Sequence, residues 1–192
     1  MASAPVVIGV DPGTQHTGYG VIAEEAGQLV ALAWGVISPR PSLALSDKLY
    51  VIYTALQACL ATHRPNILAV EQLFFAKNVR SAATLAHARG VALVVAAAVG
   101  LEVVEYSPLE IKQAVVGYGR AAKSQVQTMV QVLLNLRGQP LEEDAADALA
   151  VALCHEHGRR LRSALQHSQA SRTHDCPVDR YSGNQSSRAD RP

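Results

Sequence analysis

The sequence is poor in aromatic residues and cysteines, and it has no long uncharged run. Aromatic residues make up 5% and hydrophobic residues 49% of the 192 residues, so a core would consist mostly of alanine, valine, leucine and isoleucine. Three widely spaced cysteines, Cys59, Cys154 and Cys176, exclude a disulfide framework and a CxxC metal site. No uncharged stretch exceeds 15 residues, so we expect no membrane span. Residues 1–11 lack a basic side chain, which argues against a signal peptide and favours a cytoplasmic protein.

Charge is divided unevenly along the chain. Residues 1–157 hold 10 lysines and arginines against 13 aspartates and glutamates, whereas residues 158–192 hold 7 arginines against 3 aspartates. The net charges are therefore −3 and +4. The second segment is rich in serine, glutamine and histidine and has almost no hydrophobic periodicity. We predict one folded domain over 1–157 and a disordered basic tail over 158–192, which either adds non-specific phosphate affinity or has no function.

Hydrophobic periodicity predicts an α/β fold. Short apolar runs predict strands, and helical spacing predicts helices. The expected strands are 6–11, 18–24, 29–38, 66–71 and 101–106, and the expected helices are 45–63, 82–99, one that begins near 108, 124–136 and 143–155. Ser107, Pro108 and Glu110 form the pattern of a helix N-cap with a capping box. Tight turns join the first three strands and helices join the later ones, so we predict a five-stranded mixed sheet flanked by helices.

Four carboxylates end predicted strands or begin the last helix. Asp11 ends the first strand, Glu71 ends the fourth, and Asp144 and Asp147 share one face of the last helix. Ligands gather at strand ends in α/β sheets, so these acids meet if the first and fourth strands are neighbours. Four close carboxylates cannot all stay ionised without a cation. Hard oxygen ligands suit Mg²⁺ or Mn²⁺, and two such ions about 4 Å apart can activate water for phosphoryl displacement.

Each acid taken alone also has an ordinary structural interpretation. Asp144 lies in the first turn of its helix, where the macrodipole favours acids. Asp147 alone would more often be a surface charge than a ligand, and Asp11 is suited to an Asx turn with Gly13. The metal-site hypothesis therefore depends on the joint pattern.

Aromatic and basic side chains suggest contacts with a nucleic acid. The only two phenylalanines, Phe74 and Phe75, follow Glu71 closely and can either stack on an unpaired base or cap the core. Residues 77–123 are locally basic, which is typical both of an enzyme that handles a polyanion and of ordinary solvated helix faces. The candidate phosphate-binding side chains are Lys77, Arg80, Arg89, Lys112, Arg120 and Lys123.

Five segments in combination resemble the RuvC family of Holliday-junction endonucleases. They are IGVDPGTQHTGYGVI at 8–22, AVEQLFFAKN at 69–78, HARGVA at 87–92, KQAVVGYGRAAKSQVQ at 112–127 and DAADALAVA at 144–152. The resemblance covers about 1–157. It implies an RNase H-like fold and a homodimeric, metal-dependent endonuclease of recombination and DNA repair. Such an enzyme cuts two junction strands of like polarity and leaves 5′-phosphate and 3′-hydroxyl ends.

The resemblance also implies roles for individual residues. The family's catalytic, metal-binding acids fall on Asp11, Glu71, Asp144 and Asp147. Its base-stacking aromatic falls on Phe74, with Phe75 at a position where aromatics vary, and its important lysines fall on Lys112 and Lys123.

Cofactors and partners follow from the same resemblance. We expect Mg²⁺ or Mn²⁺, two ions per subunit, and four-way junction DNA as the substrate. The alanine-rich segment 82–99 corresponds to the dimer helix. The implied protein partners are the RuvA and RuvB branch-migration proteins, and no membrane is expected.

Three other functions stay open on the sequence. The acids are structural if the chain is a non-catalytic junction-binding or DNA-binding module. A related RNase H-like nuclease would act on another substrate, such as an RNA–DNA hybrid. The DPGT sequence at 11–14 is also found in actin-like kinases, but the chain is short for a two-lobed kinase and lacks a second such hairpin.

Overall fold

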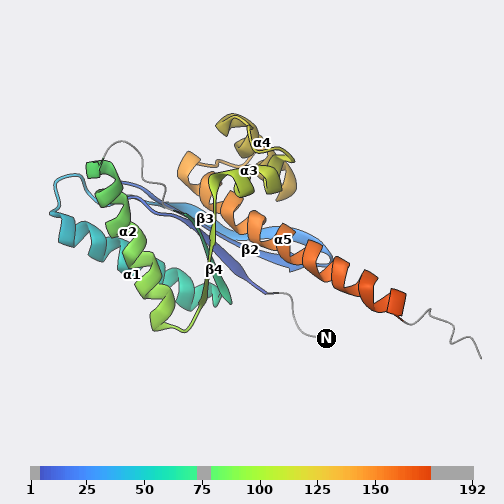
Figure 1. Ribbon diagram of the computed structural model, residues 1–192. Helices are drawn as coiled ribbons and strands as arrows, with labels where there is room; N and C mark the ends of the chain where they lie inside the picture. Colours follow the sequence, from blue (N-terminus) through green and yellow to red (C-terminus); the bar gives the residue numbers. More distant parts are fainter. Residues whose placement is uncertain (1–4, 73–78, 174–192) are drawn as a thin grey trace, which may run out of the picture. The chain divides into compact units, whose positions relative to one another are not determined.

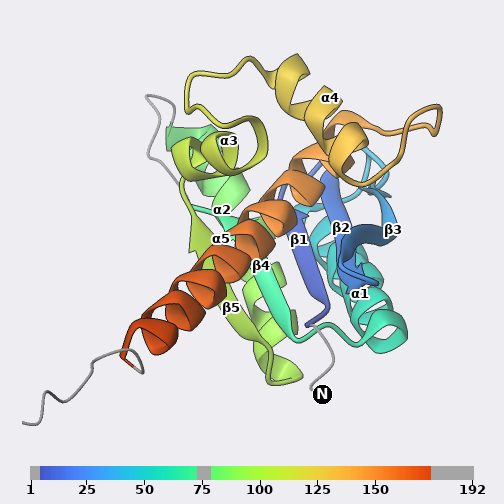
Figure 2. The same cartoon turned by 90° about the vertical axis from the view of Figure 1, so that its right-hand side faces the viewer.

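The computed structural model describes residues 5–72 and 79–173 (Figures 1 and 2). The chain divides into two compact units, Met1–Arg159 and Arg160–Pro192, and the whole sheet belongs to the first unit. The strands are β1 (Val7–Asp11), β2 (Thr17–Glu25), β3 (Gln28–Ile37), β4 (Ile67–Glu71) and β5 (Glu102–Tyr106). The helices are α1 (Leu45–His63), α2 (Val79–Ala98), α3 (Pro108–Val116), α4 (Lys123–Leu133) and α5 (Glu143–Thr173). This order of strands and helices confirms the predicted order.

The five strands form one mixed sheet in the order β3-β2-β1-β4-β5. β1 pairs antiparallel with β2, and β2 with β3; Ala26 and Gly27, both at positive φ, form the tight turn between β2 and β3. β4 pairs parallel with β1 on one side and with β5 on the other. Because β1 and β4 are parallel neighbours, their carboxyl ends lie together at one edge of the sheet. The mixed sheet and the adjacency of the first and fourth strands are both confirmed.

Helices cover both faces of the sheet (Figure 2). Successive residues of β1 point to opposite faces, so Ile8 and Val10 pack with α1 and α2, whereas Val7 packs with α3, α4 and the beginning of α5. All three side chains are fully buried, and each such burial stabilises the fold by roughly 1.5–3 kcal/mol. In the described residues, no helix has the length and hydropathy needed to cross a membrane.

Two glycines allow α5 to approach the sheet closely. A Cβ atom on Gly9 of β1 would lie 1.9 Å from the carbonyl oxygen of Ala148, and one on Gly18 of β2 would lie 1.9 Å from that of Asp144. Both distances are far below van der Waals contact, so any side chain at these positions would displace the helix. Gly18 is also the residue of β2 that pairs with Asp11. The close approach therefore places the first turn of α5 beside the end of β1.

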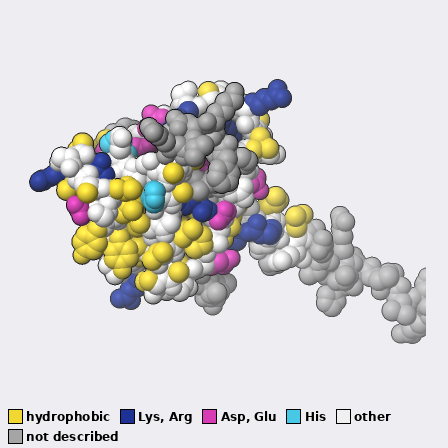
Figure 3. Space-filling model, turned by 60° about the vertical axis from the view of Figure 1, so that its left-hand side comes forward, with side chains coloured by type: hydrophobic (Ala, Val, Ile, Leu, Met, Phe, Trp, Pro, Cys, Tyr) yellow, Lys and Arg dark blue, Asp and Glu magenta, His cyan; other side chains and the backbone are white. Residues whose placement is uncertain are grey.

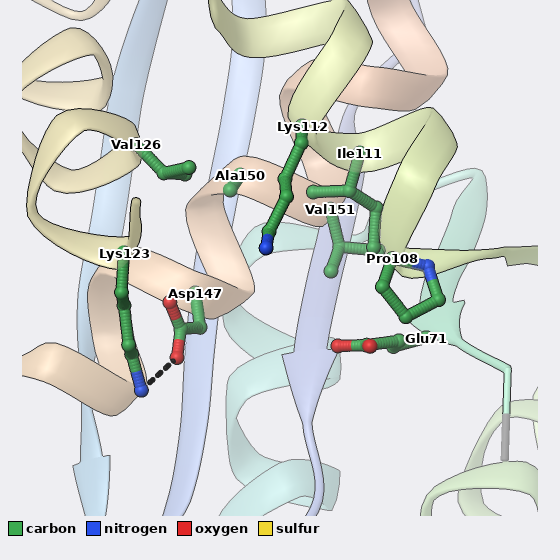
Figure 4. Close-up of a pocket in the computed structure, with 9 residues that line it drawn as sticks. All are labelled: Glu71, Pro108, Ile111, Lys112, Lys123, Val126, Asp147, Ala150 and Val151. Carbon is green, nitrogen blue, oxygen red and sulfur yellow. Dashed lines mark ion pairs between the residues drawn. The ribbon is translucent and has the colours of Figure 1, made fainter. Parts of the chain in front are cut away.

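The predicted capping box fixes the start of α3. The hydroxyl of Ser107 accepts a hydrogen bond from the Glu110 amide at 3.3 Å, and the Glu110 carboxylate accepts one from the Ser107 amide at 2.8 Å. Gly117, at φ 93°, ends the helix. Helix α4 then begins at Lys123. These two short helices present Lys112 and Lys123 next to α5 (Figure 4).

The last helix is longer than predicted, because α5 continues to Thr173 whereas the apolar spacing predicted an end at residue 155. Beyond residue 155, where the apolar spacing ends, side chains of α5 form ion pairs. Glu156 is fully buried and binds Arg159, whose guanidinium also reaches Glu24 at 3.0 Å. Residues 158–173 are thus helical where disorder was predicted, and residues 174–192 lie outside the described part. The domain boundary at 157/158 stays a prediction.

Candidate active site

The four predicted acids converge at the carboxyl ends of β1 and β4. Asp11 is the last residue of β1 and Glu71 the last of β4. Asp144 and Asp147 lie in the first two turns of α5, and the backbone of Asp144 packs on Gly18, the partner of Asp11 across the sheet. All four acids are partly buried. Residues that are distant in the sequence thus form one acidic cluster, as the sequence predicted.

The electrostatics of the cluster are dominated by burial and mutual repulsion. Burial raises the pKa of Asp11 from 3.8 to about 7, assisted by the charges of Asp147, Asp144 and Glu71, while Lys123 lowers it. Burial and Asp147 raise the pKa of Glu71, against Lys112 and Lys123. Burial also raises the pKa of Asp147, although its hydrogen bond from Lys123 acts in the opposite direction. The site therefore holds more negative charge than its surroundings stabilise.

A cavity of about 250 Å³ adjoins the cluster (Figure 4). Glu71 and Asp147 lie at its polar side, and Lys112 and Lys123 extend into it from α3 and α4. Its remaining walls are apolar and come from α3, α4 and α5. The cavity thus brings two of the acids together with the ammonium groups of two lysines, which can contact a phosphate.

A second hollow of about 460 Å³ is lined by Asp144, by the 13–16 turn and by Thr84 and Leu85 of α2. The turn is held by Thr17, whose hydroxyl donates to the Gly13 carbonyl at 2.6 Å. Asp144 thus lines this hollow, whereas Asp147 lines the first. The DPGT sequence at 11–14 overlaps this turn, but none of the residues 13–16 was predicted as a site residue.

The carboxylate oxygens of the four acids are chemically suited to a hard divalent cation, but their present arrangement does not form a binding site for one. All four side chains offer carboxylate oxygens, the ligands that Mg²⁺ and Mn²⁺ prefer, and the raised pKa of Asp11 indicates uncompensated negative charge. Within the described residues, however, no group of three or more histidine, cysteine, aspartate or glutamate side chains is arranged to hold an ion. Asp147 is bound instead to Lys123, with Nζ and Oδ2 2.8 Å apart. Side-chain movement is therefore needed before these acids can share an ion.

The predicted basic residues divide into different groups. Lys112 and Lys123 line the cavity, and Arg120 is exposed in the connection between α3 and α4. Arg89 pairs with Glu105 of β5 at 2.5 Å, and its side chain is only 12% exposed. This pair fixes α2 to β5, so we assign Arg89 a structural role and no longer a contact with DNA. The predictions for Phe74, Phe75 and Lys77 lie outside the described residues, as does the side chain of Arg80.

One residue of the cluster was missed by the sequence reasoning. Glu143 binds Lys123 together with Asp147. It precedes Asp147 by one helical turn, a spacing that places both on one face, but acids are so common at helix starts that this signal is weak. Two histidines of α5 have structural partners: His155 pairs with the Tyr106 hydroxyl at 2.9 Å and His157 with the Ala114 carbonyl at 2.8 Å.

Without divalent cations, the replacement Asp11→Asn should stabilise the protein at pH 8. The folded state keeps a proton on Asp11 up to about pH 7, whereas the unfolded chain releases it near pH 3.8, so stability falls as the pH rises through this window. A neutral amide removes this loss, which is on the order of 2 kcal/mol or about 4–8 °C in melting temperature. Thermal melts in EDTA at pH 8 and pH 4 test this. The gain should vanish at pH 4, and a variant less stable than the wild type at pH 8 would contradict the assignment.

Comparison with known proteins identifies the family. The family model described as crossover junction endodeoxyribonuclease RuvC matches residues 7–155. A protein of that name from Syntrophomonas wolfei is 51% identical over 162 residues, 84% of this chain and 94% of the relative, and one from Syntrophotalea carbinolica is 50% identical over 159 residues, 83% and 98%. RuvC of Thermus thermophilus, solved with a Holliday junction substrate, matches with a TM-score of 0.76 and 36% identity over 82% of this chain and 96% of that one.

A solved structure with low sequence identity supports the fold alone. The yeast mitochondrial Holliday junction resolvase Ydc2 matches with a TM-score of 0.60 at 13% identity, over 91% of this chain and 87% of that one. The predicted RNase H-like fold is confirmed by the mixed sheet and by these structures. With a family model and relatives that cover most of its length, this chain belongs to the RuvC family of crossover junction endodeoxyribonucleases.

Proposed function

We propose that this protein resolves four-way DNA junctions by metal-dependent phosphodiester hydrolysis during recombination and repair. The observation that carries the proposal is the convergence of Asp11, Glu71, Asp144 and Asp147 at one sheet edge, in a chain of the RuvC family. Its relatives are named crossover junction endodeoxyribonucleases. A structural or DNA-binding module would not require three further acids whose charges raise the pKa of Asp11.

The four acids act as ligands of two Mg²⁺ or Mn²⁺ ions. When bound, such ions supply an activated water and stabilise the departing oxygen of an in-line displacement. The charge of Asp11 is repelled by the other three acids, so Asp11 is the ligand whose charge the cations stabilise most. The resulting ends are a 5′-phosphate and a 3′-hydroxyl.

The lysines of the cavity act on the DNA backbone. Lys112 extends from α3 toward Glu71, and Lys123 from α4 toward Asp147 (Figure 4), so each is placed to contact a phosphate beside an acid. Exposed Arg120 extends the basic surface. Phe74 and Phe75 are proposed to stack on a base next to the cut, supported by the family motif at 69–78. Lys77 and Arg80 are proposed to contact phosphates, supported by the local basic charge of residues 77–123.

The protein acts as a homodimer through α2. A four-way junction has approximate two-fold symmetry, so a C2 dimer presents its two active sites to strands of like polarity. Hydrophobic side chains gather on one face of the first unit (Figure 3), and Val94 of α2 is 61% exposed. The exposed Ala97 and Ala98 lie one turn further along the same face of α2, and their small side chains permit close helix approach. An exposed apolar stripe of this kind is typical of a protein interface.

Replacing Val94 by glutamate should disrupt this dimer. A carboxylate at the centre of the apolar stripe would be desolvated without a partner, which should weaken self-association by about 100-fold. Light scattering on a size-exclusion column measures the mass directly. The matched control is Val132→Glu on α4, where the valine is also exposed (37%) but lies outside the stripe. Equal masses for Val94→Glu and the wild type would exclude this face.

The proposed partners and location follow from the substrate. Branch migration by RuvA and RuvB moves the junctions that such an enzyme cuts, so we propose that the protein works with them. Since its substrate is chromosomal DNA, we propose that it acts in the cytoplasm.

A cleavage assay on a synthetic four-way junction tests the function. We expect paired nicks in strands of like polarity with Mg²⁺ or Mn²⁺ and none in EDTA, resolved on a denaturing gel. Linear duplex and RNA–DNA hybrid serve as comparison substrates. Stronger cutting of the hybrid would identify a different RNase H-like nuclease, and binding without nicking in either metal would identify a non-catalytic module.

A further inference from the structure

Lys123 neutralises part of the acidic cluster. Its ammonium donates to Oδ2 of Asp147 at 2.8 Å and also binds a carboxylate oxygen of Glu143 (Figure 4 shows the contact with Asp147). Burial lowers the pKa of Lys123, but the hydrogen bonds and charges of Asp147 and Glu143 outweigh burial and raise it above its ordinary value. Lys123 is therefore a fixed positive charge at the carboxylates.

The chain positions Lys123 from a rigid point. It is the first residue of α4, and the side chain of Gln125 accepts a hydrogen bond from the Ala122 amide at 2.8 Å, which holds the preceding backbone. Glu143 and Asp147, one turn apart on α5, face it together. Its influence extends to Asp11 and Glu71, whose pKa values it lowers. The ammonium thus acts on most of the acids that would hold a cation.

A divalent cation and this ammonium require the same carboxylate. An oxygen of Asp147 that accepts from Lys123 is not available for coordination, and the positive charge repels a second cation nearby. We propose that Lys123 competes with divalent cations for Asp147, and that a DNA phosphate draws Lys123 away, so that junction binding promotes metal binding. This inference rests on the proposed function, because it concerns the same acids.

The side chain has the freedom that this exchange requires. The Lys123 side chain is 52% exposed and that of Glu143 59%, so the pair is accessible to a phosphate from solvent. Lysine carries its charge on a flexible stem with four carbons, and an ion pair this exposed contributes little stability. Lys112 provides the contrast, since it lines the same cavity but has no ion pair within the described part of the chain. Of these two lysines, only Lys123 should therefore compete directly with a divalent cation for a carboxylate.

Calorimetric titration of the DNA-free, full-length protein with Mn²⁺ tests the competition. Lys123→Met should bind Mn²⁺ about 5- to 10-fold more tightly than the wild type, because the competing ammonium is removed. Lys123→Arg, which keeps the charge and the pairing, should stay near the wild-type affinity. Lys112→Met controls for the general loss of a positive charge and should change the affinity by less than about 3-fold. Melting curves verify that each variant is folded, and Lys123→Gln provides a second neutral variant.

A second titration tests the coupling to DNA. Ca²⁺ is titrated with and without a saturating four-way junction, whose integrity is monitored on a denaturing gel. Junction binding should increase the Ca²⁺ affinity of the wild type more than that of Lys123→Met, and this difference isolates the contribution of Lys123. Equal gains would overturn the coupling. Unchanged Mn²⁺ affinity of Lys123→Met, or an equal change in Lys112→Met, would overturn the competition. Absence of cleavage by the wild type would overturn the proposed function instead, since the DNA-free titration requires no cleavage.

Discussion

Replacing Asp11 by asparagine should abolish junction cleavage while leaving junction binding intact. Asp11 lies at the end of β1, and the other three acids of the cluster all act on its carboxylate. An amide occupies the same volume but removes the negative charge, so the divalent ions lose the ligand that they stabilise most. We expect the single-turnover cleavage rate in Mg²⁺ to fall by at least about 10³-fold. Gel shifts in EDTA should show the wild-type affinity, because the lysines and arginines that bind phosphate are unchanged.

A matched control separates this effect from a general loss of charge. Asp47 is also an aspartate, but it lies exposed in the first turn of α1, away from the acidic cluster. Asp47→Asn removes the same charge and should cleave at the wild-type rate. Retained cutting by Asp11→Asn would show that the cluster does not hold the catalytic ions. Loss of junction binding by Asp11→Asn would show instead that Asp11 is needed for the fold. The melting temperature of this variant, which we predict to rise, tests the same point.

Local signals made the helices and strands predictable, because the interactions that decide them are close in the sequence. The capping box of Ser107 and Glu110 involves residues three apart, and it forms as predicted. Asp11 and Glu71 each end a short apolar run, so their position at strand ends could be inferred. What the sequence left conditional was the adjacency of β1 and β4, since no local pattern determines which strands pair. The structure meets that condition.

Interactions between distant elements could not be predicted in the same way. In the sequence, Arg89 cannot be distinguished from other basic residues. Only the structure shows that it pairs with Glu105 of β5. Where α5 continues past the predicted end, it carries the ion pair of Glu156 and Arg159, which are polar and therefore absent from the apolar pattern that predicts helices. Glu143 resembled any acid at a helix start. In each case a charged residue acquires its role from a partner that sequence periodicity does not reveal.

Replacing Gly18 by alanine should disable the site without touching any acid. The added methyl group would lie 1.9 Å from the carbonyl oxygen of Asp144, which is backbone and cannot rotate away. The first turn of α5 must therefore shift, and it carries Asp144 away from Asp11. Overpacking of this kind costs about 1–3 kcal/mol in unfolding free energy. A displacement of about 1 Å in a catalytic group lowers the rate by about 10²-fold, which single-turnover cleavage at a temperature well below melting should show.

The control distinguishes a displaced helix from a destabilised protein. Gly27 lies in the β2–β3 turn at φ 84° with no atom within 4 Å of the position of an added Cβ, so Gly27→Ala should destabilise the fold by about 1–2 kcal/mol through backbone strain alone and leave cleavage unchanged. Metal titration adds a readout that global stability does not move: folded Gly18→Ala should bind Mn²⁺ more weakly than the wild type. If Gly18→Ala melts earlier but cleaves and binds metal normally, then the position of Asp144 is not set by the contact between α5 and β2. The glycine would then serve stability alone, and the geometry of the acids would have to depend on β1 and β4.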